Sequence, residues 1–65
     1  MTPGALIRRR REELSWSQAQ LAEAAGTAQS VVSRIESGRL NPIVDMLARL
    51  AEAMHSDLTL RIVAR

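Results

Sequence analysis

Residues 17–38 read SQAQLAEAAGTAQSVVSRIESG, and this stretch decides the expected fold. Gly26 separates two short runs with helical periodicity, and glycine suits the left-handed conformation in which many helices end. Ser17 and Gln20 have the spacing of a capping box, in which each side chain satisfies a backbone N–H of the other residue. The stretch therefore predicts two short helices joined by a tight turn.

The second of these runs has two different faces. Thr27 can cap it and Gly38 closes it, which predicts a helix between them. On a helical wheel Ala28, Val32 and Ile35 point inward, toward a core. The opposite arc is polar and carries Gln29, Ser30, Ser33 and Arg34, with Val31 at its edge.

Signals on both sides of the stretch predict one further helix each. Thr2–Pro3 is an N-cap followed by proline at the first helical position, and this helix is expected to reach Leu14. Asn41–Pro42 repeats the signal and is expected to open a fourth helix that fades near residues 54–56. The expected core residues of the second and fourth helices are Leu21, Ala22, Ala25, Ile43, Leu47, Leu50, Ala51 and Met54.

Length and composition exclude several classes of protein. The chain has 65 residues, which is one small domain near the lower limit for a self-sufficient core. Nine arginines against seven acidic residues give a net charge of +2, so any attraction to nucleic acid must come from individually placed groups. There is no cysteine, and no apolar run approaches the roughly 20 residues that span a bilayer. We expect a soluble, cytoplasmic protein that does not act at a membrane.

The polar arc of the third helix offers groups that recognise the edges of DNA bases. The amide of Gln29 both donates and accepts, which matches adenine in the major groove. Arg34 offers a planar fork that fits guanine or a phosphate, and the sequence leaves both partners open. Ser30 and Ser33 are short donors, and Val31 can meet a thymine methyl group. The alternative is an ordinary solvated helix surface, because polar residues are mostly exposed in any protein.

The two helices and the turn between them resemble a known family of regulators. The motifs SQ..LA...G, Q..VSRIE.G and NP stand in order in this chain, over residues 17–26, 29–38 and 41–42. Together they resemble the DNA-binding domain of the phage-repressor and Cro type, the xenobiotic-response-element family of bacterial helix-turn-helix regulators. The resemblance spans residues 4–55. It implies an all-α fold, a compact lambda-repressor-like bundle of four short helices.

The resemblance also implies which residues touch DNA. Contacts at the start of the third helix specify the sequence, whereas contacts to the sugar–phosphate backbone fix the position of the protein. The resemblance implies that Gln29 and Ser30 meet base edges and that Arg34 contacts a base or a phosphate, and the chemistry of the polar arc adds Ser33 as a base contact. The implied phosphate contacts are Gln18, Ser37, Gly38 and Arg39.

One ion pair is expected between distant parts of the chain. On a helical wheel both Arg10 and Arg11 lie beside the apolar stripe of the first helix, so periodicity does not choose between them. The family resemblance favours Arg11 and implies that it pairs with Glu36 in a largely buried site. Trp16, which precedes an N-cap, is expected to pack on the core as a hydrophobic staple against Leu21.

The C-terminal residues 57–65 have strand periodicity, in contrast to the rest of the chain. Leu58, Leu60 and Ile62 alternate with polar residues, and a single strand cannot complete its own hydrogen-bond ladder. We expect these three residues to pair with the same strand of a second chain, so residues 1–56 form the DNA-binding domain and residues 57–65 the dimerisation segment. The alternatives are a short fifth helix or a frayed tail.

These features together predict a transcriptional regulator. A two-fold homodimer would read a palindromic operator, and the resemblance implies repression by occluding a promoter. Family members with a C-terminal strand include antitoxins that repress their own operon, and this resemblance implies a toxin as one candidate partner. The rival interpretations are a protein-interaction module and an antitoxin-type subunit that acts with a partner protein.

Catalysis is not expected. His55 is the only histidine, it lies at the end of the fourth helix, and we expect it to act at the helix terminus. The chain offers no set of metal ligands at helical spacing, so no metal site and no cofactor are expected.

Overall fold

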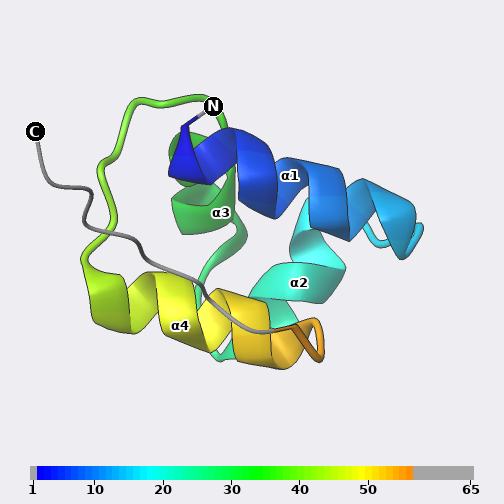
Figure 1. Ribbon diagram of the computed structural model, residues 1–65. Coiled ribbons are helices and arrows are strands. Elements are labelled where there is room, and N and C mark those ends of the chain that lie inside the picture. Colours follow the sequence, from blue (N-terminus) through cyan, green and yellow to red (C-terminus); the bar gives the residue numbers. More distant parts are fainter. Residues whose placement is uncertain (1, 57–65) are drawn as a thin grey trace, which may run out of the picture.

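The computed structural model describes residues 2–56 of the chain as four helices. They are α1 (Pro3–Glu13), α2 (Gln18–Ala25), α3 (Gln29–Glu36) and α4 (Val44–Ala53). In the view of Figure 1, α3 lies behind α1, and α2 packs against both α3 and α4. The expected all-α bundle is confirmed for this part of the chain. The strand expected at Leu58, Leu60 and Ile62 lies outside the described residues.

Local capping signals place the starts of α1 and α2 correctly. The hydroxyl of Thr2 accepts a hydrogen bond from the backbone N–H of Ala5 at 3.2 Å, and Pro3 is the first residue of α1. At the start of α2 the full capping box is present. Ser17 Oγ accepts from the N–H of Gln20 at 3.0 Å, and Gln20 Oε1 accepts from the N–H of Ser17 at 2.7 Å.

The start of α3 differs from expectation. Ala28, not Thr27, is the N-cap residue, and its side chain makes no capping bond. Thr27 is instead part of the turn that ends α2, where its N–H donates to the carbonyl of Ala22 at 2.9 Å. Ala28 is exposed and not part of the core, because its extended backbone (φ −90°, ψ 148°) lies outside the helical wheel.

The start of α4 was also predicted too early. Asn41–Pro42 belongs to the connection from α3, and the helix begins at Val44 with Ile43 as its N-cap. Ile43 has an extended backbone and is 71% exposed, so its expected place in the core is wrong. The connection from α3 to α4 forms a long arc, and Asn41, Pro42 and Ile43 are part of it (Figure 1).

A residue with positive φ follows each of the four helices within two positions. Gly26 (φ 70°) and Gly38 (φ 79°) adopt this conformation without strain, whereas Ser15 (φ 58°) and His55 (φ 53°) are not glycines. At His55 the N–H donates to Glu52 O at 2.9 Å, which is the first bond of a Schellman turn. His55 therefore acts at the helix terminus, as the sequence predicted.

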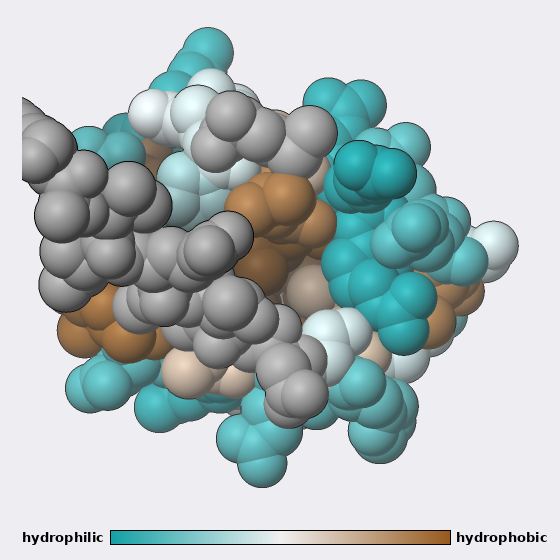
Figure 2. All heavy atoms as spheres, in the orientation of Figure 1, coloured by the Kyte–Doolittle hydropathy of each residue, from teal (hydrophilic) through white to brown (hydrophobic). Residues whose placement is uncertain are grey.

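The core lies between the four helices, and most of its buried residues come from α2, α3 and α4. Leu21, Val32, Ile35, Leu50 and Met54 are fully buried, and Trp16 packs against this cluster while half-buried. On the side shown in Figure 2, apolar atoms in the middle are bordered by hydrophilic side chains along the right and lower edges. Within residues 2–56 no buried polar side-chain atom lacks a hydrogen-bond partner.

Gly4 sets the distance between α1 and α3. It is buried, and a Cβ built on it would overlap the carbonyl oxygen of Ile35. Only a residue without a side chain lets α1 approach the last turn of α3 this closely. The N-terminal half of α1 therefore rests directly on the backbone of α3.

Candidate nucleic-acid interface

The two faces of α3 are separated as the sequence pattern indicates. Val32 and Ile35 are 0% and 1% exposed, and α1 and α2 pack against this side of the helix. The side chains on the other side all belong to exposed residues, with Val31 half-buried at the margin. These exposed residues are Gln29, Ser30, Ser33 and Arg34.

The exposed face of α3 has unused hydrogen-bonding capacity. Its four polar side chains make no hydrogen bond or ion pair with any other described residue. An amide, two hydroxyls and a guanidinium are therefore available to an external partner. This face carries no large, fully exposed apolar side chain. A helix that docks into a protein groove presents apolar side chains instead.

The loop after α3 folds back on the last turn of the helix. Arg34 O accepts from the N–H of Arg39 at 2.9 Å and from the hydroxyl of Ser37 at 3.1 Å. Gly38 supplies the left-handed residue that the turn needs. Ser37, Gly38 and Arg39 are all exposed, so this loop lies at the surface beside the C-terminal end of α3.

A bidentate ion pair ties α1 to the end of α3. Arg11 Nε lies 2.7 Å from Glu36 Oε2, and Arg11 Nη2 lies 2.9 Å from Glu36 Oε1. The two side chains are only 13% and 3% exposed. The hydrogen bond to Glu36 raises the pKa of Arg11, against the opposing effect of burial, and the guanidinium also donates to the carbonyl of Trp16 at 2.6 Å.

Arg10, the other arginine beside the apolar stripe, has a different partner. Its Nε donates to Ser56 Oγ at 2.9 Å, and its Nη1 lies 3.8 Å from Glu13. Arg10 therefore joins α1 to the segment that follows α4.

Gln18, the first residue of α2, meets the same carboxylate. Its Nε2 donates to Glu36 Oε1 at 3.2 Å across 18 positions of sequence. The start of α2 is thus linked to the end of α3 by the bond between Gln18 and Glu36. Sequence reasoning placed Gln18 and Glu36 in separate roles, because no periodicity relates residues on two different helices.

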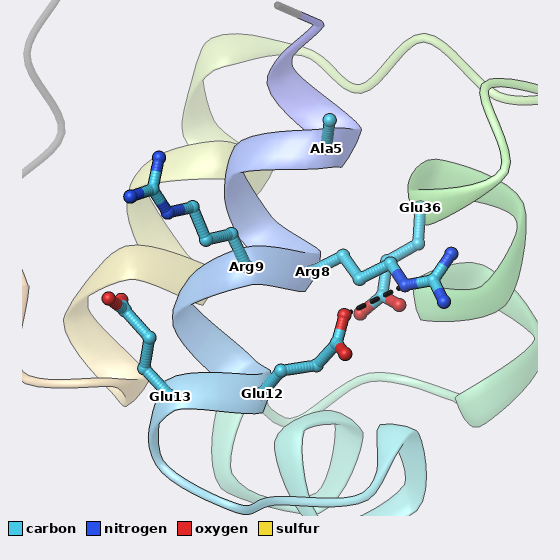
Figure 3. Close-up of a pocket in the computed structure, with 6 residues that line it drawn as sticks. All are labelled: Ala5, Arg8, Arg9, Glu12, Glu13 and Glu36. Atoms are coloured by element: carbon cyan, nitrogen blue, oxygen red, sulfur yellow. Dashed lines mark hydrogen bonds and ion pairs between the residues drawn. The ribbon is translucent and has the colours of Figure 1, made fainter.

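A surface hollow of about 480 Å³ is lined by residues of α1 and by Glu36 at the end of α3 (Figure 3). Arg8 extends across it and pairs with Glu12 at 2.9 Å, while Arg9 points away to the other side of the helix. The hollow carries both signs of charge, so it does not form a site for an anion. The part of the chain that the structure describes contains no cluster of metal-binding side chains.

Apolar side chains are exposed elsewhere on the molecule. Ile43 and Val44, at the start of α4, are 71% and 53% exposed, and Leu6 on α1 is 53% exposed. None of them lies on the polar face of α3. Among the helices of residues 2–56, none is long and apolar enough to cross a membrane.

Comparisons with known proteins agree with this geometry. A family model described as helix-turn-helix matches residues 7–60. The chain is 38% identical over 55 residues to the ImmF control region 10 kDa protein of Bacillus phage phi105, covering 85% of this chain and 61% of that protein. It is 37% identical over 49 residues to an HTH-type transcriptional regulator of Methanothermobacter thermautotrophicus, covering 75% of this chain and 71% of the relative.

A third relative is longer than this chain. An HTH-type transcriptional regulator of Mycobacterium tuberculosis is 37% identical over 51 residues, which are 78% of this chain but 36% of the relative. The similarity covers the turn between α2 and α3 and most of the bundle around it. By these matches and by its fold, the chain belongs to the helix-turn-helix family.

Proposed function

We propose that this protein is a DNA-binding transcriptional regulator that inserts α3 into the major groove of a specific duplex. The observation that carries the proposal is the exposed face of α3, whose four polar side chains have no partner among residues 2–56. The opposite face of the same helix is anchored in the core, so the helix is held as a rigid reading element. The names of the relatives, transcriptional regulators and a phage control region protein, support the same function.

Base readout is assigned to the polar residues of α3. Gln29 suits adenine, because its amide matches the adjacent donor and acceptor of that base. Arg34 suits the two acceptors of guanine, and Ser30 and Ser33 add short donors to neighbouring bases.

Backbone contacts are assigned to two segments that flank α3. Gln18 begins α2, where free backbone N–H groups favour a phosphate, and its side chain is half-buried beside Glu36. Ser37, Gly38 and Arg39 follow α3 in an exposed turn, and Arg39 supplies a positive charge. These contacts would fix the orientation of the helix on DNA without reading its sequence.

The functional unit in this proposal is a homodimer that represses transcription from a palindromic operator. The alternating residues Leu58, Leu60 and Ile62 would pair across the two-fold axis as an antiparallel ribbon. Two copies of α3 would then lie about 34 Å apart, one helical turn of DNA. Bound across a promoter, such a dimer would block transcription.

Selection of bound sequences from a random duplex pool tests this function. The pool is presented at about 150 mM salt, where non-specific binding is weak, and the oligomeric state is measured in the same buffer. We expect an inverted repeat with half-sites one turn apart and a dimeric protein. Recovery of no sequence above background would contradict DNA reading, and would favour a protein-interaction module or a subunit of a larger complex.

A further inference from the structure

Glu36 occupies an unusual position, because its carboxylate serves two partners on two other helices. Oε2 accepts from Arg11 Nε at 2.7 Å, whereas Oε1 accepts both from Arg11 Nη2 at 2.9 Å and from Gln18 Nε2 at 3.2 Å. The side chain is 3% exposed, so water cannot compete for these bonds. The ion pair alone would need only Arg11. The third bond therefore calls for its own explanation.

The carboxylate determines which end of the Gln18 amide faces inward. An ionised carboxylate accepts hydrogen bonds and cannot donate them, so the Nε2 end of Gln18 must turn toward Glu36. Nε2 carries two hydrogens, and the bond to Glu36 uses one of them. The second hydrogen stays available to another acceptor beside the start of α2.

Arg11 makes this arrangement compatible with a neighbouring phosphate. A lone carboxylate would repel the anion, but the guanidinium of Arg11 is paired to both carboxylate oxygens and balances the charge. The ion pair is thus close to neutral as seen from outside. An amide tied to it can donate to a phosphate without the penalty of an adjacent negative charge.

We propose that Glu36, balanced by Arg11, is a positioning residue that holds the amide of Gln18 ready to donate to a DNA phosphate. This inference rests on the proposed function, and it assigns Glu36 a role in binding besides joining α1 to α3. Because the amide is already ordered in the free protein, binding does not have to immobilise it. The contact is sequence-independent and sets the register of α3 in the groove.

The first test measures the order of the Gln18 side chain in the free protein. Nuclear magnetic relaxation of side-chain amides gives an order parameter for each glutamine, and Gln29 is the matched control because it is exposed and has no partner among residues 2–56. We expect Gln18 to approach the value of rigid backbone, about 0.85, and Gln29 to fall below about 0.6. Equal, low values for both amides would overturn the inference.

The second test measures DNA binding by Gln18→Met, which keeps the length of the side chain but removes its donors. We expect about tenfold weaker binding to every duplex, specific or not, since a hydrogen bond to a charged acceptor is lost. The variant also loses the bond from Gln18 to Glu36, so affinity is measured at a temperature where circular dichroism shows both proteins folded. Wild-type affinity in this variant would overturn the inference while leaving sequence reading by α3 intact. Failure of the wild-type protein to bind any duplex would overturn the proposed function itself.

The third test separates positioning from stability. Glu36→Gln removes the charge of the carboxylate and leaves Arg11 unbalanced, so folding is checked first by circular dichroism. In the folded variant we expect the order parameter of Gln18 to fall toward that of Gln29. An amide that stays as rigid as in the wild type would overturn the role of Glu36. If the variant does not fold, the relaxation of the wild-type amides and the affinity of Gln18→Met decide the question.

Discussion

On α3, Val32 and Ile35 are 0% and 1% exposed, whereas Gln29 and Arg34 on the other side of the same helix are exposed, and their side chains have no partner in residues 2–56. An isolated helix of eight residues is not stable in water, so α3 owes its existence to the buried side. The exposed side contributes little to stability and is free to serve recognition. Substitutions on the two sides should therefore have separable effects, on unfolding and on DNA binding.

The largest expected effect comes from Glu36→Ala, which breaks the anchor at the end of α3. Arg11 would remain as a buried, unpaired guanidinium, and the free energy of unfolding should fall by about 3–5 kcal/mol. Urea unfolding followed by circular dichroism measures this loss. Because a small domain has little stability in reserve, the variant should be largely unfolded at 37 °C. An unchanged melting temperature would show that the pair does not support the fold.

Gly4→Ala should destabilise the contact between α1 and α3 by about 1–3 kcal/mol, the usual range for overpacking. The added Cβ would overlap the carbonyl oxygen of Ile35, so α1 has to move away from the helix that it supports. Helix propensity alone predicts the opposite sign, because alanine favours a helix more than glycine does. A higher melting temperature in this variant would contradict the close contact between Gly4 and the backbone of Ile35.

Arg34→Ala tests the exposed side and should leave stability within about 0.5 kcal/mol of the wild type. Binding to the selected duplex should weaken by about 1–3 kcal/mol. If Arg34 reads guanine, the loss is confined to duplexes with that base, and if it holds a phosphate, all duplexes lose affinity equally. The matched control is Arg49→Ala, an exposed arginine on α4. Equal losses from both variants would indicate a general charge effect and no specific contact by Arg34.

The smallest effect is expected at the exposed ion pair of α1. Arg8 and Glu12 lie 2.9 Å apart, but their side chains are 63% and 55% exposed. Glu12→Gln should change the free energy of unfolding by no more than about 0.5 kcal/mol, and added salt should reduce even that effect. A loss comparable with that of Glu36→Ala would mean that burial does not distinguish the two pairs.

Local signals were sufficient for about half of the helix boundaries. Thr2, Pro3 and the capping box at Ser17 placed α1 and α2 correctly, because each signal acts within one turn of helix. Thr27 was assigned to the wrong helix, since its N–H completes the turn after Gly26. The start of α4 depends on the distance that the preceding connection must cross, which no local signal encodes.

The sequence also predicted only part of the candidate site. Exposure of the polar arc on α3 followed from periodicity, because one face of an amphipathic helix must remain outside the core. Periodicity could not choose between Arg10 and Arg11, and the packing of α1 decides that Arg11 meets Glu36 while Arg10 meets Ser56. The bond from Gln18 to Glu36 could not be predicted, since it joins two helices whose relative placement depends on the whole core.

Sequence selection with Gln29→Ala beside the wild-type protein tests directly whether the exposed side of α3 reads DNA sequence. Both proteins should fold equally well, because the side chain of Gln29 is exposed and makes no hydrogen bond with any other residue in 2–56. We expect the variant to select the same inverted repeat but to lose its preference at one position in each half-site. Identical selected sequences from the two proteins would contradict base reading by Gln29.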